Sequence, residues 1–266
     1  DNEANNLITV DKLLNGTDLS KSYPHLIKKD TIDDVCFLLM SCVEGVKSRF
    51  NPSKNISRNN LKMLDRSINL GMHNLIQFQK ITKTRDVDGK LYLIRKIQQS
   101  HEKINETIKI LIPDYSELLS LLKSKIMKVN DFSLPLCAIH GDYDIGNILF
   151  NKPAVAMVDF EHFKTEGIPF YDLSHLIFNP LLISFEYSAN KLNFKEYLIQ
   201  NGILEIIDRW FSEYSNAMNI PLDILRLIGP IVVLNQKSMS YPFYRDPNSY
   251  PMYTDIAFKS FIEHFI

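Results

Sequence analysis

The chain has 266 residues, of which 45% are hydrophobic and 23% are charged, and its net charge at pH 7 is −1. These values are typical of a globular protein with one large domain or two modest ones. The near-neutral charge gives no electrostatic reason to expect binding to nucleic acid or to an anionic membrane. The apolar runs are too short to cross a bilayer.

The three cysteines, Cys36, Cys42 and Cys137, lie in apolar runs that are typical of strands, without the spacing of metal ligands. An odd count of this kind predicts reduced, buried thiols. No secretory signal is visible at the start, so we expect a cytoplasmic protein. A thiol nucleophile is disfavoured, because no neighbouring residue would lower the thiol pKa.

The first 45 residues predict a helix followed by a β-hairpin. Apolar residues at helical spacing run through residues 3–14, and Asn15 and Gly16 end this pattern. Apolar runs at residues 23–27 and 35–40 predict two strands, and the polar residues 28–34 predict the turn that joins them.

Residues 51–127 have a mainly helical pattern. The polar residues 51–60 predict a connecting loop, residues 61–81 predict a helix, and residues 86–89 predict a second loop. Helical spacing returns over residues 91–127 and is interrupted at Pro113-Asp114, so we expect two helices there.

The next stretch carries polar groups between short apolar runs. Apolar runs at residues 134–139, 148–150 and 154–158 predict three buried strands. Asp142 and Asn147 are therefore expected on the loop between the first two of these strands. Asp159 is expected at the end of the third.

The remainder of the chain predicts a helical region. Residues 164–170 contain Gly167 and Pro169 and predict a loop, and a helix opens at Asp172. Further helices are predicted over residues 194–199, 203–218, 222–236 and 253–265, with an aromatic loop at residues 241–251. That loop either cages a quaternary ammonium group or packs between helices.

Three of these polar residues suit phosphoryl transfer. The reaction needs a carboxylate that takes the proton of an acceptor hydroxyl, and metal ligands that hold the nucleotide phosphates. Asp159 supplies a carboxylate ligand of the kind that Mg²⁺ prefers, and Asn147 supplies an amide oxygen. Asp142 lies five residues before Asn147, where it can face the acceptor.

These residues resemble a known family. His140-Gly-Asp-Tyr-Asp-Ile-Gly-Asn147, followed by Val158-Asp-Phe-Glu161, is similar to the motifs of the aminoglycoside phosphotransferase and choline kinase family. The similarity is tight over residues 137–175 and loose over most of the remaining chain. It implies a protein-kinase-like α+β fold with two lobes.

The resemblance also implies roles for single residues. Asp142 would be the catalytic base, and Asn147 and Asp159 would bind Mg²⁺. Asp172 would brace the catalytic loop, and His140 would either hold that loop or act as a general base. By the same resemblance, the backbone of Ser41, Cys42 and Val43 would bind the adenine of ATP, and Glu3 would lie on the helix whose glutamate pairs with a nucleotide-binding lysine.

The two predicted lobes differ in length and in secondary structure. Residues 1–45 would form an incomplete β-containing N-lobe, and residues 46–266 a mostly helical C-lobe with the acceptor site. The chain begins at Asp1 within a predicted helix. We therefore expect the family's glycine-rich loop and nucleotide lysine upstream of Asp1.

Three functions remain open at this stage. The first is an ATP-dependent kinase that phosphorylates a hydroxyl of a sugar, aminoglycoside or amino alcohol. The second is a catalytically silent kinase-like module that binds a nucleotide or a partner protein. The third, a metal-dependent hydrolase, would need more metal ligands near Asp159 than the neighbouring His162.

Glu161 is either a further metal ligand or an exposed carboxylate, and Asp144 is expected to cap the turn.

Overall fold

The computed structural model describes residues 2–33, 35–52, 56–103, 115–151, 154–187 and 194–240. The predicted aromatic loop, the last predicted helix and the interruption at Pro113 and Asp114 lie outside these residues. The chain divides into two compact units: Asp1–Arg85 with Pro135–Tyr187, and Asp86–Leu134 with Ser188–Ile266. The lobe boundary expected after residue 45 stays a prediction.

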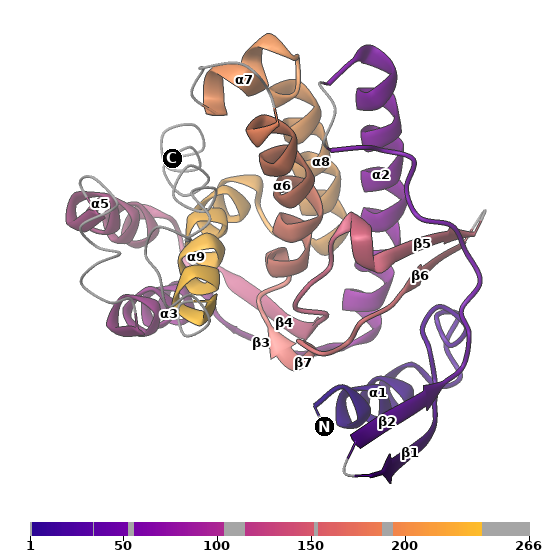
Figure 1. The fold of residues 1–266 in the computed structure, drawn as a ribbon. Coiled ribbons are helices and arrows are strands. Elements are labelled where there is room, and N and C mark those ends of the chain that lie inside the picture. Colours follow the sequence, from indigo (N-terminus) through magenta and orange to yellow (C-terminus); the bar gives the residue numbers. More distant parts are fainter. Residues whose placement is uncertain are drawn as a thin grey trace. The chain divides into compact units, whose positions relative to one another are not determined.

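The first unit begins with the predicted helix and hairpin. Helix α1 (Asn2–Leu14) buries one face, and it contacts strand β1 (Leu26–Ile32), which pairs antiparallel with β2 (Val35–Met40). In Figure 1, α1 lies beside this hairpin. The predicted position of the first strand was wrong. Most of β1 is exposed, so its polar residues reflect a solvated strand, and the turn lies at Asp33, where φ is 49°.

The cysteines are only partly where the sequence indicated. Cys137 is buried in strand β4 (Ser133–Ile139), as expected. Cys36 and Cys42 are exposed, because the hairpin that carries Cys36 is largely solvated and Cys42 follows its end. The prediction of three buried thiols was therefore wrong for two of them.

Helix α2 (Arg58–Ile81) organises the core of the first unit. It begins three residues earlier than predicted, because the Ser57 side chain accepts a hydrogen bond from the backbone N–H of Asn60 and caps the helix. Its buried face packs against α6 (Phe170–Glu186). The buried amide of Gln79 donates to the backbone O of Pro169 at 2.6 Å, which fixes the start of α6.

The candidate site residues between positions 140 and 159 lie among the strands of two short sheets. Strand β4 (Ser133–Ile139) lies between β3 (Lys83–Asp88) and β7 (Lys164–Gly167), and β5 (Ile148–Asn151) pairs antiparallel with β6 (Ala154–Met157). The predicted strands β4, β5 and β6 are thus confirmed. The predictions of loops at residues 86–89 and 164–170 were wrong over β3 and β7. Both flanking strands are largely exposed and polar, so they lack the apolar pattern of β4.

The second unit is helical in its described residues. It contains α3 (Gly89–Lys103), α5 (Tyr115–Lys128), α7 (Phe194–Gln200), α8 (Leu204–Met218) and α9 (Leu222–Ser240). Helix α9 contacts α3, α5 and α8, and the fully buried Trp210 and Phe211 of α8 belong to the core. No helix among the described residues is long and apolar enough to span a membrane.

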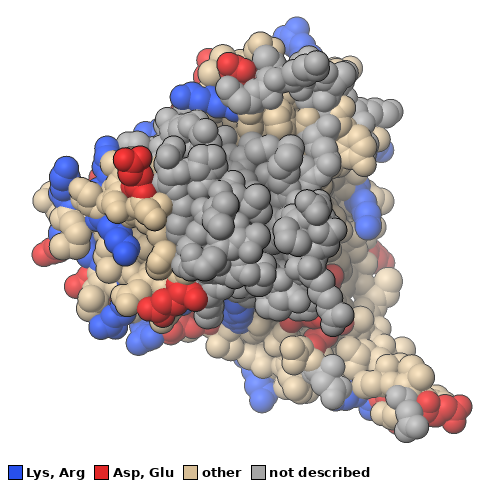
Figure 2. Space-filling view, turned by 60° about the vertical axis from the view of Figure 1, so that its left-hand side comes forward, with Lys and Arg blue, Asp and Glu red and all other residues tan. Residues whose placement is uncertain are grey.

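The observed architecture is α+β, as predicted. On the face shown in Figure 2, basic and acidic side chains are interspersed over the described surface, in keeping with the net charge of −1.

Candidate active site

The loop between β4 and β5 is held in place by hydrogen bonds to the side chain of Asp172. This residue lies in the first turn of α6 and is completely buried. Its two carboxylate oxygens accept hydrogen bonds from the backbone N–H groups of His140 (2.8 Å) and Gly141 (2.9 Å). Burial outweighs these two bonds and raises the pKa of Asp172 to about 7. The loop that precedes Asp142 is therefore fixed by two hydrogen bonds to one side chain.

Gly141 is required by the path of this loop. Its φ is 89°, a conformation that L-residues rarely adopt. A Cβ at this position would also lie 2.2 Å from the backbone O of His162. The close approach of two backbone segments leaves room only for glycine.

His140 lies in the interior of the site. Its Nε2 is 3.0 Å from the backbone O of Val158, and its ring lies 4.6 Å from that of Phe160. Its Nδ1 faces the backbone N–H of Asp142 at 3.4 Å. Burial lowers the pKa of His140 to about 4, so the ring is neutral at pH 7. With both ring nitrogens engaged by backbone groups, the geometry favours the loop-holding interpretation over the general base.

Asp142 and Asn147 are directly hydrogen-bonded. The Nδ2 of Asn147 donates to the Oδ2 of Asp142 at 2.9 Å and to its backbone O at 3.0 Å. The Asp142 side chain keeps 37% of its surface exposed. Burial raises the pKa of the Asp142 carboxyl, while His162 and the bond from Asn147 lower it.

The turn that carries Asp144 is capped as predicted. Its Oδ1 accepts hydrogen bonds from the backbone N–H groups of Gly146 at 2.5 Å and Asn147 at 3.2 Å. The neighbouring Tyr143 is buried, and its hydroxyl donates to the backbone O of Gly71 and to the Oδ1 of Asn74, both on α2. The loop is thus attached to two helices, α6 and α2.

Asp159 is brought beside this loop by strand β6. The backbone N–H of Val158 donates to the backbone O of Asn147 at 3.0 Å, and Asp159 follows with a φ of 67°. Burial, followed by the carboxylates of Asp159 and Glu161, raises the pKa of Glu3 on α1. The loop, the end of β6 and the start of α1 therefore converge on one acidic region.

The donors fit Mg²⁺, although the described residues contain no group of three or more His, Cys, Asp or Glu side chains suited to a metal. Mg²⁺ is usually held by one or two carboxylates together with substrate phosphates and water. Asp159 offers a carboxylate. Asn147 uses its Nδ2 toward Asp142, so its Oδ1 is left as an acceptor.

Ser41, Cys42 and Val43 follow strand β2. The backbone N–H of Ser41 donates to the backbone O of His25 at 2.9 Å, and its Oγ accepts from the backbone N–H of His25 at 2.8 Å. The Ser41 N–H is thus already used within the chain. The backbone groups of the exposed Cys42 and the half-buried Val43 are candidates for an adenine contact, and the Val43 O also lies 3.9 Å from the Cys42 Sγ.

Two residues near Asp142 escaped the sequence analysis. The Nδ1 of His175 lies 3.7 Å from the Oδ1 of Asp142 and 3.3 Å from the Nδ2 of Asn179. The Nε2 of His175 is buried and has no hydrogen-bond partner among the described residues. Burial lowers the pKa of His175 to about 4. The available signal was helical spacing, because His175 and Asn179 lie three and seven residues after Asp172 on α6.

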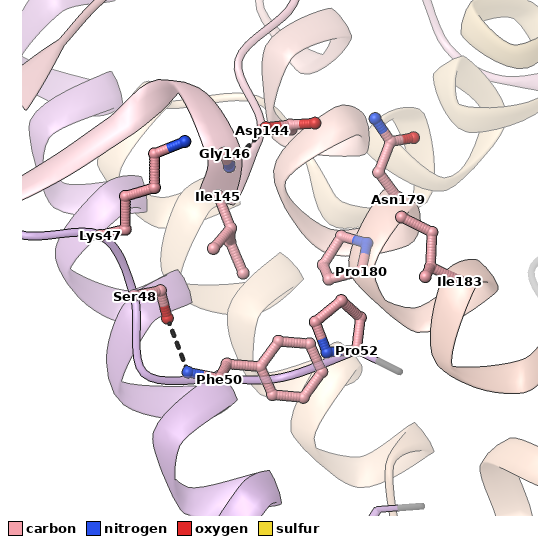
Figure 3. A pocket seen from close by; sticks show the side chains of 10 residues that line it. All are labelled: Lys47, Ser48, Phe50, Pro52, Asp144, Ile145, Gly146, Asn179, Pro180 and Ile183. Carbon is pink, nitrogen blue, oxygen red and sulfur yellow. Dashed lines mark hydrogen bonds between the residues drawn. The ribbon is translucent and has the colours of Figure 1, made fainter. Parts of the chain in front are cut away.

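A pocket of about 260 Å³ adjoins the loop between β4 and β5. In Figure 3 the polar ends of Lys47, Asp144 and Asn179 lie along one side of the pocket. The remaining lining is mostly apolar: Phe50, Pro52, Ile145, Pro180 and Ile183, with Ser48 and Gly146. Pockets that bind drug-sized ligands typically have volumes of about 300–1,000 Å³, so this pocket suits a smaller molecule.

Residues 60–190 match the model of a family described as the phosphotransferase enzyme family. Over this segment, just under half of its length, the chain is similar to the phosphotransferase enzyme family. The matched segment contains all the loop and strand residues of the candidate site, from His140 to Asp172. A comparison with curated proteins finds no match.

Solved structures show the same fold. One is assigned to the aminoglycoside phosphotransferases and comes from Ralstonia eutropha JMP134. It is 16% identical with a TM-score of 0.54 over 98% of this chain and 80% of its own. A glucosamine kinase is 12% identical with a TM-score of 0.57 over 98% and 69%. The predicted kinase-like α+β fold is thereby confirmed.

Proposed function

We propose that this protein is a phosphotransferase that moves the γ-phosphoryl group of ATP to a hydroxyl group of a small molecule. The observation that carries the proposal is the bridging position of Asn147. Its Nδ2 donates to the Asp142 carboxylate, and its backbone O accepts a hydrogen bond from the N–H of Val158, the residue before Asp159. The base and the metal ligands of a phosphoryl-transfer site would thus be held by one residue.

Asp142 is proposed as the catalytic base. It would orient the acceptor hydroxyl and take its proton as the oxygen forms a bond to the γ-phosphorus and the bond to the leaving ADP oxygen breaks. Its partial exposure gives the acceptor access, and Asn147 fixes the rotation of its carboxylate. Asp172 and His140 would act by holding the loop, since both contact backbone near Asp142.

Asn147 and Asp159 are proposed as the residues that would hold Mg²⁺, which would neutralise charge on the nucleotide phosphates. The backbone of Cys42 and Val43 would contact adenine, together with the carbonyl side of Ser41. A nucleotide in this position would lie over the β5–β6 hairpin, because residue Val46 is bridged to Phe150 of β5 by two backbone hydrogen bonds of 3.1 and 2.8 Å.

The pocket lined by Asp144, Asn179 and Ile183 is proposed as the acceptor site. Asp144 lines the pocket and follows Asp142 by two residues. His175 does not line the pocket, but it lies 3.7 Å from Asp142 and 3.3 Å from the lining residue Asn179. The volume of about 260 Å³ suits a compact hydroxyl compound, such as a monosaccharide or amino alcohol, better than an aminoglycoside of several rings.

The proposal is tested by incubating the full-length protein with Mg²⁺, radiolabelled ATP and a fractionated extract of small metabolites. We expect the γ-phosphate to appear in a low-molecular-weight product. The product should be absent with Asp142→Asn and present with Asp131→Asn, an exposed aspartate at which only a surface ion pair is lost. ATP binding without transfer to any fraction would support the silent module instead.

A further inference from the structure

Helix α1 is attached to the turn that follows Asp159 through one side chain. The Nδ2 of Asn6 donates to the backbone O of Phe160 at 2.7 Å and to the backbone O of Glu161 at 3.0 Å. Its acceptors lie 154 and 155 residues away in the chain. A primary amide has two N–H groups on this nitrogen, so both bonds can form at once.

The turn held by Asn6 has an unusual backbone. Asp159 has a φ of 67°, which is rare for a residue other than glycine and is found where surrounding contacts impose it. On its N-terminal side, the N–H of Val158 is fixed by the backbone O of Asn147. On its C-terminal side, Asn6 fixes the next two carbonyl groups. Asp159 is therefore held between two sets of hydrogen bonds.

Helix α1, which carries Asn6, is packed against the rest of the first unit. The helix residues Ala4, Leu7 and Val10 are at most 1% exposed. Phe160 is also fully buried, and its ring lies 4.6 Å from that of His140. The donor and acceptor sides of the contact thus both belong to packed parts of the first unit.

We propose that Asn6 is a positioning residue that sets the orientation of Asp159 and hence the affinity of the site for a divalent metal. The inference rests on the proposed function, in which Asp159 holds Mg²⁺. Residues that orient metal ligands through hydrogen bonds typically change metal affinity by about 10–100-fold when they are replaced. Helix α1 would thereby act on the metal site through the backbone of residues 160 and 161.

The chemistry of the contact explains why an amide is needed. Alanine would leave both carbonyl groups without their donor. Aspartate has the same shape but only acceptor oxygens when ionised, and it would add a charge near Glu3, Asp159 and Glu161. Serine keeps one donor and should retain part of the effect.

The chain offers a matched control in Asn5. It is the preceding residue of α1, has the same side chain and is exposed. Replacing it by alanine tests the effect of an Asn→Ala change in this helix without removing the two bonds to residues 160 and 161.

The experiment measures binding of Mn²⁺ to the full-length protein in the presence of ADP, by electron paramagnetic resonance. We expect Asn6→Ala to weaken Mn²⁺ binding at least about 10-fold. Asn6→Asp should weaken it as much or more, and Asn6→Ser less. Asn5→Ala should bind as the wild type does, and ADP binding without metal should be unchanged in all variants. Amide exchange at residues 159–163 should be faster in Asn6→Ala than in Asn5→Ala.

The outcomes separate the two claims. Wild-type protein that binds no Mn²⁺ with ADP would contradict the metal site and the proposed function with it. If the wild type binds Mn²⁺ and folded Asn6→Ala binds it equally well, only the role of Asn6 is overturned. Should Asn6→Ala fail to fold, Asn6→Ser decides: wild-type affinity together with wild-type exchange at residues 159–163 would contradict the proposal.

Discussion

Asn147 donates two hydrogen bonds to Asp142 from the same nitrogen, one to the carboxylate and one to the backbone O. The pair fixes the Asp142 side chain and leaves the amide oxygen of Asn147 for another partner. This relationship links the proposed base to the proposed metal site and supplies the first prediction.

Asn147→Asp should shift the pH dependence of turnover. The change removes the donor to Asp142 and adds a negative charge beside it, and both effects raise the pKa of Asp142. Because a base acts in its ionised form, the acid limb of the kcat/KM profile should move to higher pH by about one unit. Profiles with saturating Mg²⁺ test this, and an unchanged acid limb would contradict the role given to Asp142.

Gly141→Ala should destabilise the protein. The new Cβ would need a strained φ and would approach the backbone O of His162, which cannot move independently of its chain. We expect the free energy of unfolding to fall by at least about 2 kcal/mol. Gly16→Ala is the control, since its φ of 77° gives similar strain without any atom within 4 Å of the added Cβ. Equal losses of stability in urea would show that the contact with His162 is unimportant.

Buried groups around the loop predict opposing effects of pH on stability. The pKa of Asp172 is raised to about 7. Its contribution to the free energy of unfolding is therefore present at low pH and is lost as the pH rises toward 7. The pKa of His175 is lowered to about 4. Its contribution to the free energy of unfolding is therefore present above about pH 6.5 and is lost as the pH falls toward 4.

Variants separate these two contributions. Between pH 4 and 7, Asp172→Asn should make the free energy of unfolding rise more steeply with pH than in the wild type. His175→Gln should make it rise less steeply, with His140 still contributing in the same direction as His175. Urea unfolding at several pH values measures the slopes. Identical slopes in wild type and variants would contradict these titrations.

Ile183→Phe should reduce the space of the pocket. The added ring atoms would occupy part of about 260 Å³, so the KM of the acceptor should rise by about 10-fold or more while the KM of ATP stays the same. Ile199→Phe is the matched control, because Ile199 is an exposed isoleucine on α7 that does not line this pocket. An unchanged acceptor KM in Ile183→Phe would place the acceptor elsewhere.

The sequence allowed the centre of the site and two residues that hold its loop, His140 and Asp172, to be predicted, but not the other contacts around it. Asp142 and Asn147 lie close together in the chain, between apolar runs that form buried strands, so their proximity was visible. Asn6 reaches the site through folding over a long separation, and no local pattern marks it. His175 could have been found only from its helical spacing after Asp172. Strands β3 and β7 were missed because they are exposed and polar, and their pairing with β4 depends on the tertiary structure.

The most direct test of the account compares acceptor-dependent phosphoryl transfer in the wild type and in Asp142→Asn, with Mg²⁺ and ATP and the acceptor identified from the metabolite extract. We expect Asp142→Asn to lower kcat by about 10²–10⁴-fold, while the Kd of ADP and the Tm stay near those of the wild type. Asp131→Asn should keep wild-type kcat. Turnover of Asp142→Asn at the wild-type rate would contradict the proposed catalytic site.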